Sequence, residues 1–148
     1  MLTLTQRTLV LSAILFTQFL GWLPMQATNT NAVTKPFTLL VIKREHCPHC
    51  EQWQNDVYSH WQELGLEKNI PKSHIRILDA EKDDDMKSLM ELINTGKIKD
   101  EIHFVPTFIV LNSNNEEIPS CRVSGYKNIA GFKHDIQRSL SQYKKTAN

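Results

Sequence analysis

The sequence contains few cysteines and carries almost no net charge. The 148 residues include three cysteines and carry a formal net charge of +1, with no basic stripe along the chain. This charge pattern does not indicate nucleic-acid binding. A structural zinc site needs about four ligands, usually including a second Cys or His pair at close spacing, and the third cysteine, Cys121, stands alone. The length suffices for one domain with a real core but not for two.

Charged residues are almost absent from the N-terminus. Arg7 is the lone positive residue, and a mostly apolar run follows it over residues 8–23. This layout predicts a secretory signal peptide over residues 1–27, and its cleavage could extend to residue 32. An uncleaved membrane anchor is the alternative, but the run is slightly short for a membrane span and contains Gln18.

The residues after the signal peptide predict an exported protein. No cysteine lies near the cleavage point, so a lipoprotein anchor is not expected. Residues 28–35 are polar and predict a flexible mature N-terminus, and residues 36–148 form the predicted domain. We therefore expect a periplasmic or otherwise exported protein, in a compartment where disulfides form and persist.

Two of the three cysteines form the motif Cys47-Pro48-His49-Cys50 between a predicted strand and a predicted helix. Two intervening residues on a first helical turn let the two sulfurs close a small disulfide ring. The helix N-terminus offers unpaired N–H groups that favour a thiolate at Cys47. Pro48 gives up no needed hydrogen bond there. This arrangement predicts a redox site in which Cys47 is the nucleophile and Cys50 the resolving thiol.

Other roles for these cysteines stay open at this point. His46, His49 and His103 could join the pair in a copper or zinc site. A purely structural disulfide is a weaker alternative, because a two-residue loop constrains the unfolded chain little. Cys121 is expected to be a free, buried thiol, although an odd cysteine in an exported protein can also pair between chains.

Hydrophobic periodicity predicts an alternation of strands and helices. The expected strands are 37–42, 74–78, 103–111 and 118–123, and the expected helices are 47–64, 83–95 and 128–143. The order β, α, β, α, β, β, α predicts an α/β fold with a central mixed β-sheet flanked by helices on both faces. Residues 97–101 are expected to be exposed. The side chains expected to face the core include Trp53, Val57, Trp61 and Leu64 on the first helix and Ile129, Phe132, Ile136 and Leu140 on the last.

Over residues 36–143 the chain resembles the thioredoxin superfamily. Two motifs carry the resemblance: the CPHC motif of residues 47–50 after a strand, and Val105-Pro106-Thr107 at the head of a later strand. The resemblance implies that Pro106 is a cis proline lying against the active-site disulfide. It also implies that these three residues form a substrate-binding loop, in which the backbone of Val105 pairs with a bound partner segment.

Two groups within the superfamily are similar to this chain. The CPHC sequence is that of periplasmic disulfide oxidases of the Dsb type, but this chain lacks their long helical insertion. The chain also looks like small exported thioredoxin-like proteins. This second similarity is carried by Trp53, the strand VPTFIVL, the segment 122–126 and Phe132. These proteins include the one of bacterial sulfur-oxidation systems, which keeps a partner's thiols reduced.

The sequence departs from the superfamily at one position. Thioredoxins and Dsb oxidases carry a buried acid six residues before the first cysteine, and this chain has Val41 there. Proton transfer to and from Cys50 must then use water, Glu45, Lys43 or another group.

These features together predict an exported thiol–disulfide oxidoreductase that acts on protein disulfides or thiols. We expect a monomer that works with a membrane redox partner and needs no cofactor or metal. His49 and Pro48, the two residues between the cysteines, are expected to tune the redox pair. His49 should stabilise the Cys47 thiolate and raise the reduction potential of the pair, and a higher potential favours an oxidant or isomerase. The overall resemblance favours a reductant, so the direction stays open. The alternative function is a thioredoxin-fold metallochaperone or a non-catalytic regulatory module using the same cysteines.

Overall fold

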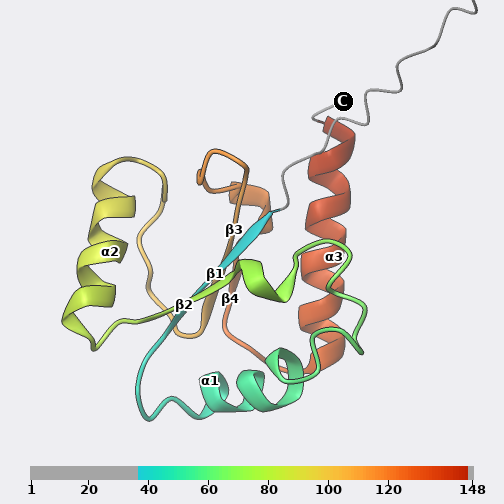
Figure 1. Ribbon diagram of the computed structural model, residues 1–148. Helices are drawn as coiled ribbons and strands as arrows, with labels where there is room; N and C mark the ends of the chain where they lie inside the picture. Colours follow the sequence, from blue (N-terminus) through green and yellow to red (C-terminus); the bar gives the residue numbers. More distant parts are fainter. Residues whose placement is uncertain (1–36, 147–148) are drawn as a thin grey trace, which may run out of the picture. The chain divides into compact units, whose positions relative to one another are not determined.

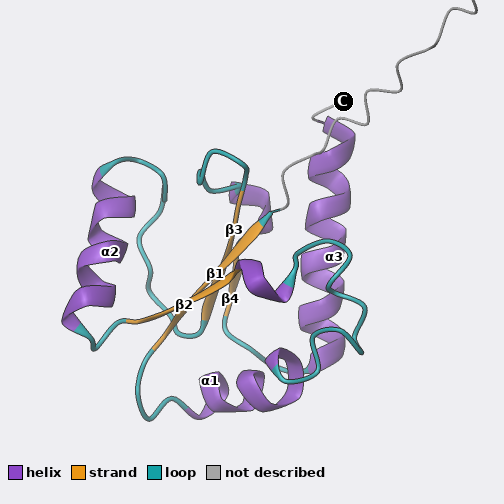
Figure 2. Cartoon of the chain, viewed as in Figure 1, coloured by secondary structure: helices purple, strands orange, loops and turns teal. Residues whose placement is uncertain are grey.

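The computed structural model describes residues 37–146, so the predicted signal peptide (1–27) and mature N-terminus (28–35) lie outside the described residues. The elements follow the predicted order β, α, β, α, β, β, α (Figures 1 and 2). They are β1 (Thr38–Lys43), α1 (Pro48–Trp53), β2 (Ile75–Asp79), α2 (Asp83–Asn94), β3 (Thr107–Leu111), β4 (Val123–Ser124) and α3 (Ile129–Thr146).

The strands form one four-stranded mixed sheet in the order β2-β1-β3-β4. β1 pairs with β2 in parallel and with β3 antiparallel, and β4 pairs antiparallel with β3. β1 is central because its four apolar residues, 39–42, are buried on both sides, which suits an interior strand. The predicted mixed sheet is therefore confirmed.

Alternate residues of β1 point to two separate hydrophobic clusters, one on each face of the sheet. Leu39 and Val41 pack with residues of α1 and α3, and Leu40 and Ile42 pack with residues of α2. This alternation is the period-two geometry of a strand. Helices therefore cover both faces, as the sequence predicts.

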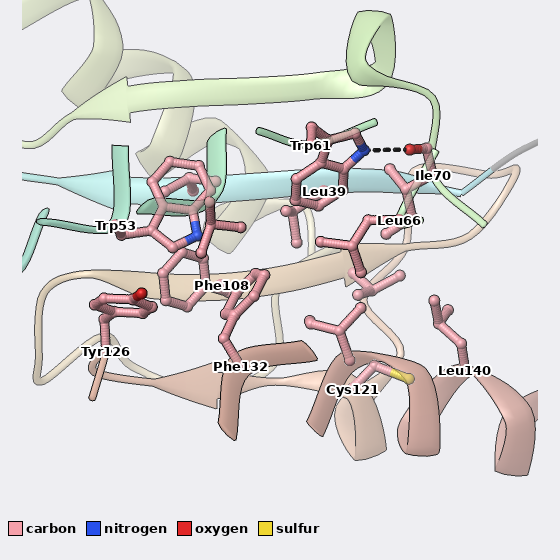
Figure 3. Close-up of a cluster of buried hydrophobic side chains, with 14 of the residues drawn as sticks. Leu39, Trp53, Trp61, Leu66, Ile70, Phe108, Cys121, Tyr126, Phe132 and Leu140 are labelled. Carbon is pink, nitrogen blue, oxygen red and sulfur yellow. Dashed lines mark hydrogen bonds between the residues drawn. The ribbon is translucent and has the colours of Figure 1, made fainter. Parts of the chain in front are cut away.

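The α1 and α3 face holds an aromatic core (Figure 3). The ring centroids of Phe108 and Phe132 lie 4.7 Å apart, and those of Trp53 and Phe108 lie 5.1 Å apart. The indole N–H of Trp61 donates to the carbonyl oxygen of Ile70 at 2.8 Å, whereas that of Trp53 is buried with no partner among residues 37–146. Both tryptophans are core residues, which confirms that prediction.

The first helix is shorter than the predicted 47–64. The α-helix ends at Trp53 and continues as a π-helical turn over Gln54–Tyr58. The Ser59 amide donates to the Gln54 carbonyl at 3.0 Å, five residues back. The wider turn keeps Val57 and Trp61 fully buried, so the predicted inward stripe survives although the regular helix does not.

The two predicted C-terminal strands are also shorter. Residues 103–106 lie outside β3, because Pro106 has no N–H for the ladder and Phe104 is 68% exposed. In the predicted return strand 118–123, residues 119–121 form a 3₁₀ turn, and only Val123–Ser124 pair with β3. Pro119 again explains the break, because it cannot donate to a ladder.

Two expectations about burial are wrong. Ile98 in the segment expected to be exposed is 2% exposed and belongs to the α2-side cluster. Ile129, expected to face inward, is 38% exposed at the first turn of α3. On α2, Leu92 is buried and Met90 is 45% exposed. None of the helices within residues 37–146 has the length and apolar character of a membrane span.

Candidate functional site

Cys47 and Cys50 form a disulfide at the start of α1, with their Cα atoms 5.2 Å apart. Cys47 is the N-cap residue, and Pro48 occupies the first helical turn. The Cys50 amide donates to the Cys47 sulfur at 3.2 Å. Cys47 is half-buried and Cys50 is 2% exposed. The first sulfur is therefore the more accessible one, and a backbone N–H already points at it.

The turn that leads into the disulfide has an unusual backbone. His46 has a φ of 54°, in the left-handed region, which is uncommon for residues other than glycine. His46, Pro48 and His49 are all exposed around the half-buried Cys47. Such conformations concentrate at functional sites, where the surrounding structure holds them in place.

The second motif forms a loop just before β3. The Val105–Pro106 peptide bond is cis, as the resemblance implied. The carbonyl of Pro106 accepts a hydrogen bond from the Gly125 amide at 2.7 Å, and the Thr107 hydroxyl donates to the Phe104 carbonyl. Within residues 37–146, neither the amide nor the carbonyl of Val105 has a backbone partner. That residue therefore presents free hydrogen-bonding groups.

The strand register brings the two motifs to the same end of the sheet. Ile42 near the end of β1 pairs with Thr107 at the start of β3. The chain then runs from Lys43 through a short turn to Cys47, and Figure 1 shows α1 at this end. The position of Pro106 directly against the disulfide stays a prediction.

An ion pair between Lys43 and Asp79 lies at this end of the sheet. Val41 is 1% exposed in the core, and the next residue on the same face, Lys43, donates to Asp79 at 2.6 Å. These two residues are register partners at the ends of β1 and β2. The hydrogen bond from Lys43 holds the pKa of Asp79 below its usual value, although burial opposes the shift. Lys43, one of the groups expected to carry protons for Cys50, is thus paired with a carboxylate.

A second buried ion pair supports the segment that carries Val105. The Glu117 side chain is fully buried and accepts hydrogen bonds from Arg122 at 2.7 and 2.8 Å. Burial raises the pKa of Glu117, but the hydrogen bonds from Arg122 and from the Lys99 amide outweigh it, and the pKa lies below its usual value. Arg122 also donates to the carbonyls of Asp100 and Glu101, each at 3.1 Å.

Two other buried ionisable groups lie in the core. Tyr126 donates to the Asp56 carboxylate at 3.0 Å, and burial together with that carboxylate raises the pKa of Tyr126 to about 12. Cys121 is a free, fully buried thiol in the 3₁₀ turn, and burial raises its pKa. The free thiol is as predicted, but its position in a strand was wrong.

His46, His49 and His103 are the candidate metal ligands to join the two cysteines. Among residues 37–146, no three His, Cys, Asp or Glu side chains are placed to hold one metal ion. The Nε2 atom of His103 lies 3.9 Å from Oε2 of Glu101, on the segment before β3.

Sequence reasoning found both cysteines and the Val105 loop but missed Asp79 and Glu117, whose roles depend on partners distant in the chain.

Comparison with known proteins gives no match to any protein-family model and none to any curated protein. Among solved structures, the fold is similar to the reduced periplasmic thioredoxin SoxS of Paracoccus pantotrophus, with a TM-score of 0.55 and 19% identity over 72% of this chain and 98% of that chain. A thioredoxin from Thermus thermophilus has a TM-score of 0.49 and 20% identity, covering 74% of each chain. A thioredoxin-fold protein from Helicobacter pylori has a TM-score of 0.48 and 16% identity, over 76% of this chain and 86% of that one. Together with the sheet order, the similarity to SoxS establishes that this chain has a thioredoxin-like fold carrying a CxxC disulfide.

Proposed function

We propose that this protein is an exported thiol–disulfide oxidoreductase that acts on partner proteins through Cys47 and Cys50. The observation that carries the proposal is the disulfide at the N-terminus of α1, with one accessible sulfur and one buried sulfur. The thioredoxin-like fold is consistent with thiol–disulfide exchange. The exchange itself needs no cofactor, because both electrons pass between sulfur atoms.

The reductive reaction proceeds in two steps. The Cys47 thiolate attacks one sulfur of a partner disulfide, and the other partner sulfur leaves as a thiolate that takes up a proton. Cys50 then loses its proton and attacks the Cys47 sulfur, which breaks the mixed disulfide and releases the second partner thiol. Cys47 and Cys50 are left oxidised, and the same steps in reverse oxidise a partner.

The loop at Val105 supplies the means to hold a partner segment. Its amide and carbonyl are free within residues 37–146, so an extended segment can pair with them as an added strand does. Pro106 and Thr107 hold this backbone in place through their bonds to Gly125 and Phe104. In this proposal Val105, Pro106 and Thr107 bind substrate, and Pro48 and His49 tune the redox pair.

The cellular setting is part of the proposal. The apolar N-terminal run supports export to the periplasm, and SoxS, which has a similar fold, is a periplasmic thioredoxin. We propose a monomer that exchanges electrons with a membrane redox partner. N-terminal sequencing of the exported protein tests the cleavage after Ala27, and an intact Met1 would contradict it.

Cysteine variants test the assignment of the two thiols. Cys47→Ser is expected to abolish the reduction of insulin disulfides, because the attacking thiolate is lost. Cys50→Ser is expected to trap mixed disulfides, which non-reducing gels and mass spectrometry detect.

Cys121→Ala is the matched control, since this free thiol lies in the core, and it is expected to keep the activity. Faster alkylation of Cys50 than of Cys47 in the reduced protein would contradict the roles. Loss of activity in a folded Cys121→Ala protein would contradict them as well.

A further inference from the structure

A cavity of about 230 Å³ lies beside the Val105 loop, on the α2 side of the sheet. Much of its wall is apolar and includes Ile42 of β1, Met86 and Leu89 of α2, and Val105 itself. An apolar cavity of about 150 Å³ is large enough to bind benzene. The cavity is therefore large enough for one apolar side chain of a partner, next to the backbone groups that would hold that partner.

The remaining wall of the cavity has positive charge and an exposed aromatic ring. Arg44, His103 and Phe104 line it, and no acidic residue of the described part of the chain does. The exposed Arg44 guanidinium has neither a carboxylate nor a hydrogen-bond partner among residues 37–146, and Phe104 is 68% exposed. An unpaired guanidinium beside an apolar cavity is complementary to a carboxylate next to an apolar side chain.

Strand geometry says which partner residue can reach the cavity. Cys47 begins the helix that packs on one face of the sheet, and Leu89 belongs to the helix on the other face. Successive side chains of an extended segment point to opposite sides. When the partner cysteine faces Cys47, the residues adjacent to it in the partner chain face the cavity.

We propose that this cavity, the Arg44 pocket, selects protein partners in which an apolar residue lies next to the exchanging cysteine and an acidic residue stands two positions beyond the apolar one, so that both side chains point to the same side of the partner segment. The apolar side chain enters the cavity between α2 and Val105, and the acidic side chain pairs with Arg44. The proposal rests on the proposed function, since it names the substrates of the same site.

Four peptide probes test the pocket. Each has a central cysteine joined to glutathione by a disulfide, and the sequences are Glu-Ala-Phe-Cys-Phe-Ala-Glu, Lys-Ala-Phe-Cys-Phe-Ala-Lys, Glu-Ala-Ser-Cys-Ser-Ala-Glu and Lys-Ala-Ser-Cys-Ser-Ala-Lys. The symmetry makes the probes independent of binding direction. The second-order rate of each with the reduced full-length protein is divided by its rate with dithiothreitol, which removes differences in intrinsic reactivity. We expect the Glu-Phe probe to exceed the Lys-Ser probe by about tenfold, which corresponds to ~1.4 kcal/mol.

Substitutions separate the two parts of the pocket. Arg44→Glu is expected to reverse the preference for glutamate over lysine while the preference for phenylalanine stays. Ala80→Leu narrows the cavity, which Ala80 lines, and is expected to remove the preference for phenylalanine. Met86→Phe narrows the same cavity from α2 and repeats this test if Ala80→Leu does not fold. Arg76→Glu makes the same charge change at an exposed site on β2 and is expected to keep both preferences.

The outcomes distinguish the pocket from the function. Equal normalised rates for the four probes with a protein that exchanges disulfides would overturn the pocket and leave the proposed function standing. The same holds if Arg76→Glu changes the preferences as much as Arg44→Glu does. No exchange with any probe would overturn the proposed function and the pocket together.

Discussion

At the scale of single residues, the buried carboxylate at this end of the sheet belongs to β2 and not to β1. Val41 of β1 is an apolar core residue, and Asp79, at the end of the neighbouring strand, is buried. Its oxygens are occupied: Oδ2 accepts from Lys43 and Oδ1 from the Glu81 amide. Asp79 therefore joins the ends of β1 and β2, where the chain leaves the sheet for α1.

We expect Asp79→Asn to destabilise the protein at neutral pH. The variant leaves Lys43 without its carboxylate, and a hydrogen bond to a charged group contributes roughly 1.5–3 kcal/mol. The folded-state pKa of Asp79 is depressed below 3.8, so this stabilisation is present above the unfolded value and is lost as the pH falls through the folded one. The difference in unfolding free energy between the two proteins should therefore narrow when urea titrations are moved from neutral pH to below about 4.

Asp84→Asn is the control, because Asp84 is exposed on the first turn of α2. Its effect is expected to stay within about 0.5 kcal/mol. A difference for Asp79→Asn that stays constant into acid would show that its carboxylate contributes nothing through its charge.

The sequence was sufficient to predict two features that depend on local spacing or on the resemblance. Cys47 and Cys50 need only one helical turn to form their disulfide, and the resemblance implied the cis bond before Pro106. Asp79 and Arg44 could not be assigned, since neither has a motif of its own. Asp79 pairs with Lys43, which is 36 residues away in the chain, and Arg44 lines a cavity between separate elements.

At the scale of elements, the segment between α2 and β3 is held in place from a distance. Glu117 accepts a hydrogen bond from the Lys99 amide at 2.9 Å, and its own amide donates to the Lys97 carbonyl at 2.7 Å. Arg122 adds bonds to two further carbonyls of the same segment. This segment continues directly to Val105, so the clamp made by Glu117 and Arg122 supports the loop proposed to bind partners.

Glu117→Gln should weaken this clamp. Removing one charge of a buried pair leaves the other uncompensated, which typically costs roughly 3–5 kcal/mol. We expect a loss of about 3 kcal/mol in the unfolding free energy and faster hydrogen exchange at the Lys99 amide. Urea titration and amide exchange measure the two effects.

The neighbouring Glu116→Gln serves as the control, because Glu116 is exposed and, among the described residues, its side chain accepts only from Asn112. It is expected to change stability by less than about 0.5 kcal/mol. Equal losses in the two variants, or unchanged protection at Lys99, would contradict the clamp.

The same long-range contacts explain which elements the sequence could predict. β1 was predictable, because a buried strand needs only its own apolar run. The return strand was not, because Glu117 and Arg122 on either side of the 3₁₀ turn bond to another segment, although Pro119 was a local signal against a regular strand. Ile98 is buried for a similar reason: it covers the α2-side cluster, which exists only after the sheet has formed.

At the scale of the whole molecule, the redox state and the folding stability are linked. Reduction of the folded protein, unfolding, and reoxidation of the unfolded chain make a closed cycle. The difference in unfolding free energy between the reduced and oxidised proteins therefore equals the difference in reduction potential between the folded and unfolded pairs multiplied by nF, for a two-electron couple. A group that stabilises the Cys47 thiolate raises the potential and the stability of the reduced form together.

His49→Pro should lower both quantities by matching amounts. The proline is tolerated at the first helical turn, and the exposed imidazole beside Cys47 is lost. We expect the reduction potential, measured by equilibration with glutathione, to fall by on the order of 30 mV, which corresponds to ~1.4 kcal/mol. Urea titrations should show the same energy as a loss of unfolding free energy of the reduced protein relative to the oxidised one. His134→Ala, an exposed histidine on α3, controls for the loss of an imidazole elsewhere. An unchanged or higher potential would show that His49 does not tune the pair, and a change in potential without the matching change in stability would show that His49 also acts on the unfolded chain.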